Sequence, residues 1–220
     1  MKNFIITLRN NQLSETIADE CIEQARKFNL FFEKFDAVNG IHADDSKKRL
    51  NVAPSRKMRP GALGCALSHI TLWKSCLEDN EAYFILEHDG FVIENIPLDI
   101  LEKFNDILKL DICNPYSECY EQELDNSQTR SLEILNIPED SNMISNAGQY
   151  SRGTYGYIIK PHAAKKLLDW IDIHGFLRSD HQLGNGICEI AITNKSLIRL
   201  HPYYLGKVKS LSLTTFLTNE

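Results

Sequence analysis

The feature that most constrains the fold is an apolar run that leads directly into charged side chains, at residues 83–90. Its aromatic and β-branched residues, closed by Gly90, favour a buried strand over a helix. Glu87 and Asp89 then stand at the carboxyl end of that strand, where open α/β sheets bind their ligands. Carboxylates in an acid-x-acid triplet can hold a divalent cation. The alternative is a strand that ends in a solvated turn, and these eight residues leave both interpretations open.

The first 40 residues have a strand, helix, strand pattern, which predicts α/β architecture. Residues 4–8 are expected as a buried strand and residues 30–38 as a second strand. Between them Ser14 can cap a helix, and Glu15 in its first turn complements the helix dipole. Such a unit predicts a parallel strand pair with a right-handed crossover. The expected buried face of the helix consists of Ile17, Cys21, Ala25 and Phe28.

Residues 47–59 contain six basic side chains and no acid. A charge run of this kind is usually a solvated surface loop. The alternative is a loop that meets a phosphorylated ligand, because guanidinium groups bind phosphate oxygens in pairs.

The segment 61–74 predicts a helix with small residues at its start. Such a start can bind an anion or pack tightly against the sheet. Ser68 and His69 are adjacent and project in different directions, so they are not a ready nucleophile pair. A single helical histidine such as His69 is more often a hydrogen-bonded core residue than a ligand.

The second half of the chain is expected to hold a helix near 98–108, then a polar, irregular or mobile loop at 113–150 with one short element at 131–137. Gly153 and Gly156 open a strand whose start can approach a ligand or another backbone closely. Pro161 fits the first turn of the next helix. A polar loop at 178–184 and short elements at 187–192 and 196–200 complete the core. No linker or repeat is visible, which predicts a single domain over 1–220.

The composition narrows the class of protein. With 220 residues, 43% hydrophobic and 25% charged, the chain is typical of a soluble globular protein. The net charge of −6 disfavours nonspecific binding to nucleic acid or anionic membrane. Six scattered cysteines without a CxxC exclude a zinc ribbon and suit reduced thiols in the cytoplasm. No run reaches the roughly 20 apolar residues of a membrane span. The chain is therefore predicted to be cytoplasmic, and peripheral membrane contact through a partner stays open.

Several of these blocks together resemble the family-25 glycosyltransferases, the lipooligosaccharide-type sugar transferases. The blocks are 6–8, 37–40, 61–73 with its Gly-Cys-Ala-Leu-Ser-His core, 85–90 and 153–168. The resemblance implies an A-type glycosyltransferase fold, a Rossmann-like α/β sandwich with a mostly parallel central sheet flanked by helices. It also implies a metal-dependent, inverting transfer of galactose or glucose from a UDP-sugar to a glycan, such as lipooligosaccharide, or to another hydroxyl acceptor.

The resemblance also implies site residues. The family's acidic triplet usually reads Glu-Asp-Asp, and here it reads Glu87-His88-Asp89. Asp89 is the expected metal ligand, and Glu87 is expected at the donor site. His88 departs from the pattern: it can add a nitrogen ligand, which favours Mn²⁺ over Mg²⁺, or point away. His201 is expected as a late metal or phosphate contact. The other expected donor-site residues are Thr7, Arg9, Ser68, His69, Gly153 and Gly156.

The chemistry of the transfer needs two further things. A divalent cation stabilises the charge that builds on the leaving nucleotide diphosphate. An inverting displacement also needs a base to take the proton of the acceptor hydroxyl. Asp180 is the first candidate for the base, because the family has an aspartate in a similar late loop, and His181 is the second. The alternative for Asp180 is a loop residue that caps a turn.

Three other functions remain open at this point. His69, His88, Asp89 and Asp180 loosely match the scattered ligands of HD-type phosphohydrolases, which have an all-helical fold. A non-catalytic module that binds a nucleotide sugar or glycan is the second alternative. The third is the same transferase acting on a modified DNA base, which the basic window at 47–59 allows and the net charge opposes.

Overall fold

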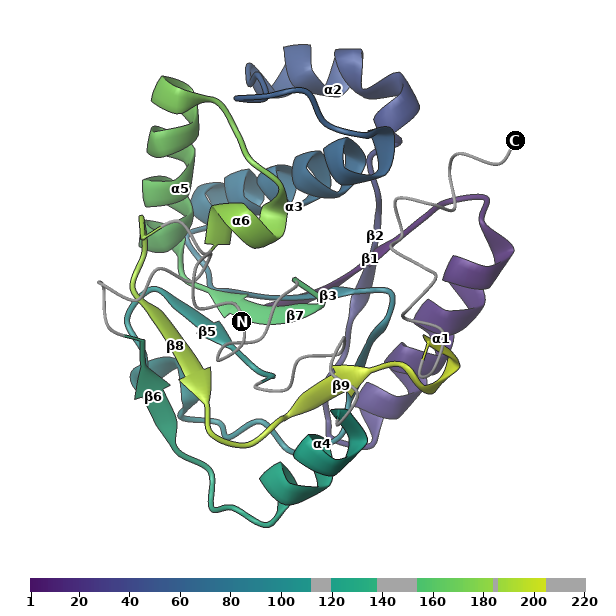
Figure 1. The fold of residues 1–220 in the computed structure, drawn as a ribbon, viewed down its shortest axis with the longest axis vertical. Coiled ribbons are helices and arrows are strands. Elements are labelled where there is room, and N and C mark those ends of the chain that lie inside the picture. Colours follow the sequence, from purple (N-terminus) through teal and green to yellow (C-terminus); the bar gives the residue numbers. More distant parts are fainter. Residues whose placement is uncertain (112–119, 138–153, 184–185, 205–220) are drawn as a thin grey trace.

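The computed structural model describes residues 1–111, 120–137, 154–183 and 186–204 (Figure 1). They form a seven-stranded sheet in the order β2-β1-β3-β7-β5-β8-β6 and a separate two-stranded sheet of β4 and β9. The strands are β1 (Lys2–Thr7), β2 (Glu33–Asp36), β3 (Tyr83–Glu87), β4 (Gly90–Val92), β5 (Ile107–Lys109), β6 (Ile134–Asn136), β7 (Gly156–Ile159), β8 (Ile190–Thr193) and β9 (Ile198–Leu200). The helices are α1 (Gln12–Arg26), α2 (Ala43–Leu50), α3 (Pro60–Asp79), α4 (Tyr120–Gln128), α5 (Pro161–His174) and α6 (Ser179–Leu183), with short 3-10 helices η1 (Gly40–His42), η2 (Ile100–Glu102) and η3 (Pro202–Tyr204).

The strand β3 lies inside the sheet and is covered on both faces. Phe84 and Leu86 join a core with α1, whereas Tyr83 and Ile85 join a second core with α3 and α5. Alternate side chains of a strand point to opposite faces, so a strand buried on both faces must be apolar throughout. This is why the run at 83–86 is continuous. In Figure 1, α3, α5 and α6 lie on one side of the sheet, and α1 and α4 lie on the other.

The α/β class is confirmed, but the sheet is mixed rather than mostly parallel. β1 pairs in parallel with β2 and β3, and β5 with β8, whereas β7 runs antiparallel to both β3 and β5, and β6 to β8. A buried strand needs an apolar run in either direction, so its sequence does not reveal which way it runs. A central sheet of this size also excludes the all-helical fold of the HD-type phosphohydrolases.

Three local predictions about the first half were wrong. Asn11 caps α1, because its side chain accepts a hydrogen bond from the Ser14 amide, while Ser14 Oγ accepts one from the Leu8 amide. The basic window is partly helical, because α2 ends in three basic residues that suit the negative end of the helix dipole. The expected helix at 98–108 is instead η2 followed by β5, which pairs with β7 and β8. Tertiary pairing here overrides the helical spacing of the apolar residues.

Other elements agree with the sequence. The parallel pair of β1 and β2 joined by α1 is confirmed, and α3 and α5 each have proline in their first turn. The expected element at 131–137 is β6, but α4 and the short helix α6 were not predicted. The remaining parts of the expected loop at 113–150 lie outside the described residues. Among the described helices, none is long and apolar enough to span a bilayer.

The start of α3 packs unusually closely on the segment after β2. A Cβ atom at Gly64 would lie 2.3 Å from the Val38 carbonyl oxygen and 2.9 Å from the Gly40 nitrogen. Only glycine allows backbone to meet backbone at this distance. Of the two interpretations of the small residues at this helix start, tight packing is confirmed at Gly64.

Asp106 is a buried anion that joins separate elements of the fold. Its carboxylate, 2% exposed, accepts hydrogen bonds from Lys166 Nζ at 2.6 Å and from the Glu189 amide at 2.8 Å, and lies 2.8 Å from His162 Nε2. Burial acts to raise the pKa of Asp106, but these hydrogen bonds and the nearby positive charges outweigh it and hold the pKa below its usual value.

We therefore predict that Asp106→Asn lowers the free energy of unfolding by about 2 kcal/mol at pH 7, the scale of hydrogen bonds to a charged group. Because the folded pKa is depressed, the ionised carboxylate stabilises the fold at neutral pH. That contribution is lost as the pH falls below the pKa of Asp106 in the unfolded state towards its lower pKa in the folded state. Urea unfolding at pH 7 and pH 3.5 measures both effects. Asp169→Asn, which removes an exposed pair with Lys165 on α5, is the control and should change stability by less than about 0.5 kcal/mol. Equal losses in the two variants would contradict the prediction.

Candidate functional site

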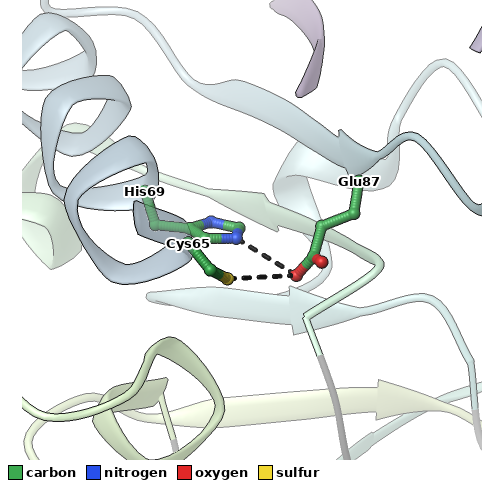
Figure 2. Close-up of side chains that lie close together, drawn as sticks. All are labelled: Cys65, His69 and Glu87. Atoms are coloured by element: carbon green, nitrogen blue, oxygen red, sulfur yellow. Dashed lines mark hydrogen bonds and ion pairs between the residues drawn. The ribbon is translucent and has the colours of Figure 1, made fainter. Parts of the chain in front are cut away.

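The candidate site lies where β3 ends beside α3. Cys65 and His69 stand one turn apart on α3, and both point to the Glu87 carboxylate (Figure 2). His69 Nε2 is 3.3 Å from Glu87 Oε1, and Cys65 Sγ is 3.8 Å from the same oxygen. The three candidate ligand atoms lie within 4.8 Å of one another, close enough to surround one ion.

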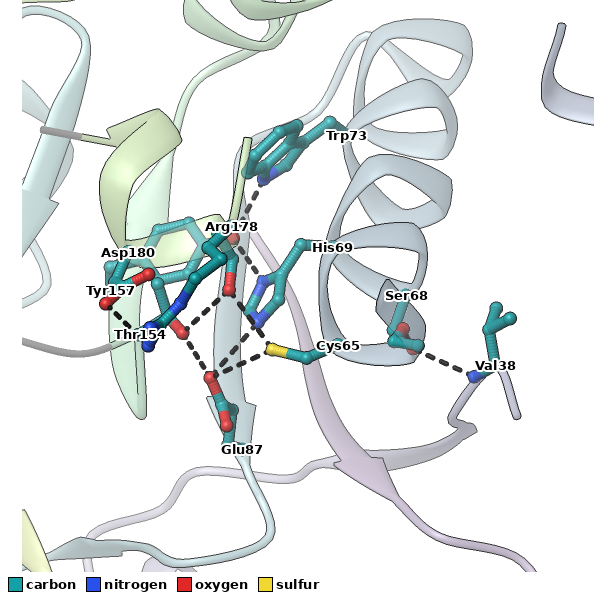
Figure 3. A network of polar contacts seen from close by, with 12 residues as sticks. Val38, Cys65, Ser68, His69, Trp73, Glu87, Thr154, Tyr157, Arg178 and Asp180 are labelled. Carbon is teal, nitrogen blue, oxygen red and sulfur yellow. Dashed lines mark hydrogen bonds and ion pairs between the residues drawn. The ribbon is translucent and has the colours of Figure 1, made fainter. Parts of the chain in front are cut away.

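Two further segments reach this cluster of side chains, one of them at the Glu87 carboxylate itself (Figure 3). The Thr154 hydroxyl, just before β7, donates a hydrogen bond to Glu87 Oε1. Ser179, the first residue of α6, lies 3.3 Å from the Thr154 hydroxyl and 3.1 Å from Cys65 Sγ. Polar contacts at Glu87, Thr154 and Cys65 therefore join β3, α3, the segment before β7 and α6.

A chain of hydrogen bonds continues behind His69 into the core. His69 Nδ1 is 2.8 Å from the Tyr157 hydroxyl, which also accepts a hydrogen bond from Trp73 Nε1 at 2.8 Å. All three side chains are buried. His69 is thus a hydrogen-bonded core residue and also a contact of the candidate site, so the two interpretations of this histidine are not exclusive.

Glu87 and Asp89 have opposite electrostatic environments. Burial acts to raise the pKa of Glu87, but hydrogen bonds from His69 and Thr154 outweigh it, and the pKa lies below its usual value. Asp89 is 8% exposed, and its Oδ1 is buried without a hydrogen-bond partner among the described residues. Burial, and then the negative charge of Glu87, raise the pKa of Asp89 to about 8. A buried carboxylate without a partner is costly, and a divalent cation would supply the missing positive charge. The donor set at Asp89 therefore fits a metal.

His88 and His201 lie beside the acidic pair with their rings engaged elsewhere. His88 Nε2 is 3.2 Å from the Tyr204 hydroxyl, and burial lowers the pKa of His88 to about 4. The His201 ring accepts a hydrogen bond from the Tyr203 amide at Nδ1, so its Nε2–H donates to Glu20 at 3.0 Å. His201 contacts Asp89 through its backbone, with its amide donating to the Asp89 carbonyl at 2.7 Å. Their metal roles stay predictions.

Asp180 and His181 lie on α6 at the rim of the site. Asp180 Oδ1 accepts a hydrogen bond from the His181 amide at 3.0 Å, and Oδ2 accepts one from Arg178 at 3.2 Å. The first contact is to the adjacent amide, whereas a capping aspartate accepts from an amide two or three residues further along the chain. The carboxylate nevertheless remains 26% exposed and adjoins Ser179. Arg56, from the basic window, lies 3.2 Å from His181 Nδ1, so one cation of that window does reach this rim.

Two of the expected donor-site residues have structural partners. Ser68 is fully buried, donates to the Gly64 carbonyl and accepts from the Val38 amide, each at 2.8 Å. Gly156 lies in the core, where a Cβ atom would come within 1.9 Å of the Ile198 side chain. The close approach predicted at Gly156 is therefore to a core side chain, and a donor role for either residue stays a prediction.

The remaining expected donor-site residues lie at the end of β1 or outside the described part. Thr7 is buried as the last residue of β1, where it faces Asp36 of β2. Arg9 is exposed and forms an ion pair with Asp36 at 3.0 Å. Gly153 lies outside the described residues.

Three residues of the site were not predicted from the sequence: Cys65, Thr154 and Ser179. Cys65 stands four residues before His69, so helical periodicity places both on one face and could have revealed the pair. Thr154 and Ser179 are small hydroxyl residues without a local signature. Only the packing of β7 and α6 against the end of β3 identifies them.

Lys109 was also missed, although a lone lysine within the apolar run at 107–110 is a detectable signal. It is 5% exposed at the end of β5. Burial lowers the pKa of Lys109 to about 8, against the opposing negative charges of Asp111 and Asp180. Lys109 thus lies near enough to Asp111 and Asp180 for their charges to interact with its own.

Comparison with known proteins identifies relatives of this chain. Residues 1–181 match the model of glycosyltransferase family 25 (LPS biosynthesis protein). A protein of Haemophilus influenzae named "Putative glycosyltransferase" is 33% identical over 118 residues, which are 50% of this chain and 41% of that relative. The aligned part of this chain therefore spans about two fifths of the length of the curated relative it matches.

We predict that Asp89 destabilises the metal-free fold. A raised folded pKa means that the folded state holds the proton more tightly, so stability falls as the pH rises from about 4 to about 8. Asp89→Asn removes this dependence. In EDTA, the free energy of unfolding of the variant should exceed that of wild type by about 1 kcal/mol or more at pH 8, and by less at pH 6. Urea unfolding at the two pH values measures the difference. A variant that is less stable than wild type at pH 8 would show that Asp89 supports the fold.

Proposed function

Because this chain belongs to glycosyltransferase family 25, we propose that it transfers a hexose, galactose or glucose, from a UDP-sugar to a hydroxyl group of a glycan such as lipooligosaccharide. One observation carries the proposal beyond the family: the buried Asp89 Oδ1 has no hydrogen-bond partner among the described residues, and it stands beside a fixed Glu87 at the end of a central strand. Structural carboxylates are normally paired, so an unpaired one at a ligand-binding edge indicates a functional role.

Asp89 is the residue that would hold the metal ion. When bound there, Mn²⁺ or Mg²⁺ supplies Lewis-acid stabilisation of the charge on the leaving diphosphate. The rings of His88 and His201 have other partners, so we propose an oxygen ligand set, which both ions accept. This refines the earlier alternative of a nitrogen ligand from His88.

The other side chains position the reactants and move the proton. Glu87 is held as an anion by His69 and Thr154, and it orients the donor. Asp180 is proposed as the base: it takes the proton of the acceptor hydroxyl while that oxygen attacks the anomeric carbon. The bond to the nucleotide diphosphate breaks on the opposite face, which inverts the configuration. Arg178 contacts one oxygen of Asp180 and limits its rotation, while the partial exposure of Asp180 leaves access for an acceptor.

We expect a panel of UDP-sugars to raise the melting temperature only when Mn²⁺ or Mg²⁺ is present, and one of them to support transfer to a glycan acceptor. The thermal-shift measurement identifies the donor, and radiolabelled or coupled transfer confirms turnover. Binding of a UDP-sugar with no hydrolysis or transfer would instead favour a non-catalytic module. Absence of binding across the whole panel would overturn the proposal.

Asp180→Asn separates catalysis from binding. Loss of a general base should lower kcat by about 100-fold or more, while donor affinity changes little. Asp172→Asn, an exposed aspartate on α5, is the control and should behave like wild type. An Asp180→Asn enzyme with wild-type kcat would assign a structural role to Asp180.

A further inference from the structure

We propose that Trp73, Tyr157 and His69 form a directed hydrogen-bond relay that occupies one oxygen of Glu87 and leaves the other to accept a hydroxyl group of the donor. The identity of the hydroxyl ligand rests on the proposed function, whereas the relay itself does not. Glu87 is then a hydroxyl-binding residue, and His69 is the residue that positions it.

The direction of the relay follows from counting hydrogens on Tyr157. Its hydroxyl is fully buried and accepts the Trp73 Nε1–H at 2.8 Å. The single hydrogen of the hydroxyl then needs an acceptor, and among the described residues His69 Nδ1, at 2.8 Å, provides it. An Nδ1 that accepts carries no hydrogen, so the hydrogen of the neutral imidazole is on Nε2. Nε2–H therefore donates to Glu87 Oε1, 3.3 Å away.

This assignment decides between two uses of the cluster of Cys65, His69 and Glu87. Its atoms lie close enough to surround an ion, but a metal ligand must offer the lone pair of Nε2. Moving the hydrogen to Nδ1 would leave the buried Tyr157 hydroxyl without an acceptor, which is unfavourable. The hydrogen-bond directions thus favour a hydrogen-bond cluster over a metal site at these three residues.

The two oxygens of Glu87 are used differently. Oε1 accepts from His69 Nε2, from the Thr154 hydroxyl and, at 3.8 Å, from the Cys65 thiol. The hydrogen bonds of the described residues leave Oε2 unused, and it lies on the side away from Cys65 and His69 (Figure 2). The side chain is 16% exposed, so a ligand can reach it. An ionised carboxylate oxygen only accepts, so a sugar or ribose hydroxyl is a matching donor.

The relay is tested by ¹⁵N NMR of the histidine side chains, with His69→Gln to assign the signal. We expect the neutral Nε2–H tautomer for His69 in wild type and in Tyr83→Phe. The latter is a matched control that removes another core tyrosine hydroxyl, the one that donates to Asp79. Tyr157→Phe should yield a mixture of tautomers. An Nδ1–H tautomer in wild type, or a His69 signal that shifts on titration with Zn²⁺, would overturn the relay.

The free oxygen is tested by calorimetric titration of the Mn²⁺-loaded enzyme with the UDP-sugar, with UDP and with deoxy analogues of each. Removal of the recognised hydroxyl should weaken binding to wild type by about tenfold or more, because the buried acceptor is left unpaired. Glu87→Gln should bind the donor and that analogue about equally. Weaker binding of deoxy-UDP than of UDP indicates that Glu87 recognises a ribose hydroxyl. Weaker binding that is confined to UDP-deoxy-sugars indicates a hydroxyl of the hexose. Unchanged discrimination in Glu87→Gln would overturn the role of Oε2, whatever the tautomer of His69.

Discussion

The structure depends on how it accommodates two carboxylates at the buried end of β3. Glu87 is compensated by hydrogen bonds from α3 and from the segment before β7, whereas Asp89 has a buried oxygen without a partner in the described part of the chain. Burial and the charge of Glu87 act together on Asp89, and the pKa values of the two acids are driven apart. Neighbouring acids with separated pKa values are typical of functional sites.

The packing of α3 fixes the positions of the side chains that contact Glu87. Gly64 allows the helix to touch the segment after β2, and Ser68 ties the same turn to the Val38 amide. Cys65 and His69 therefore reach Glu87 from a fixed helix rather than from a loop. The Trp73 and Tyr157 contacts then orient the His69 ring from behind. A site built on regular elements holds its geometry better than one built on loops.

Much of this could be predicted from the sequence, because it follows from local pattern. The continuous apolar run before Glu87 requires burial on both faces, and a turn that is rich in small residues requires close packing. The direction of β7 could not be predicted, because parallel and antiparallel buried strands have the same composition. The compensation of Glu87 by Thr154, and the contact of Ser179 with Thr154, were also missed, since hydroxyl residues carry no signal until the fold brings distant segments together. Membership of glycosyltransferase family 25 confirms the resemblance that the separate blocks carried.

The central claim is that Asp89 Oδ1 has no hydrogen-bond partner among the described residues because Asp89 binds a divalent cation. Electron paramagnetic resonance of Mn²⁺ tests this directly, since the free ion loses its sharp signal when the protein binds it. In the presence of UDP, wild type and Asp169→Asn should bind the ion and weaken its signal. With Asp89→Asn, the signal should equal that of a sample that contains Mn²⁺ and UDP without protein. Wild-type binding of Mn²⁺ by Asp89→Asn would contradict the account.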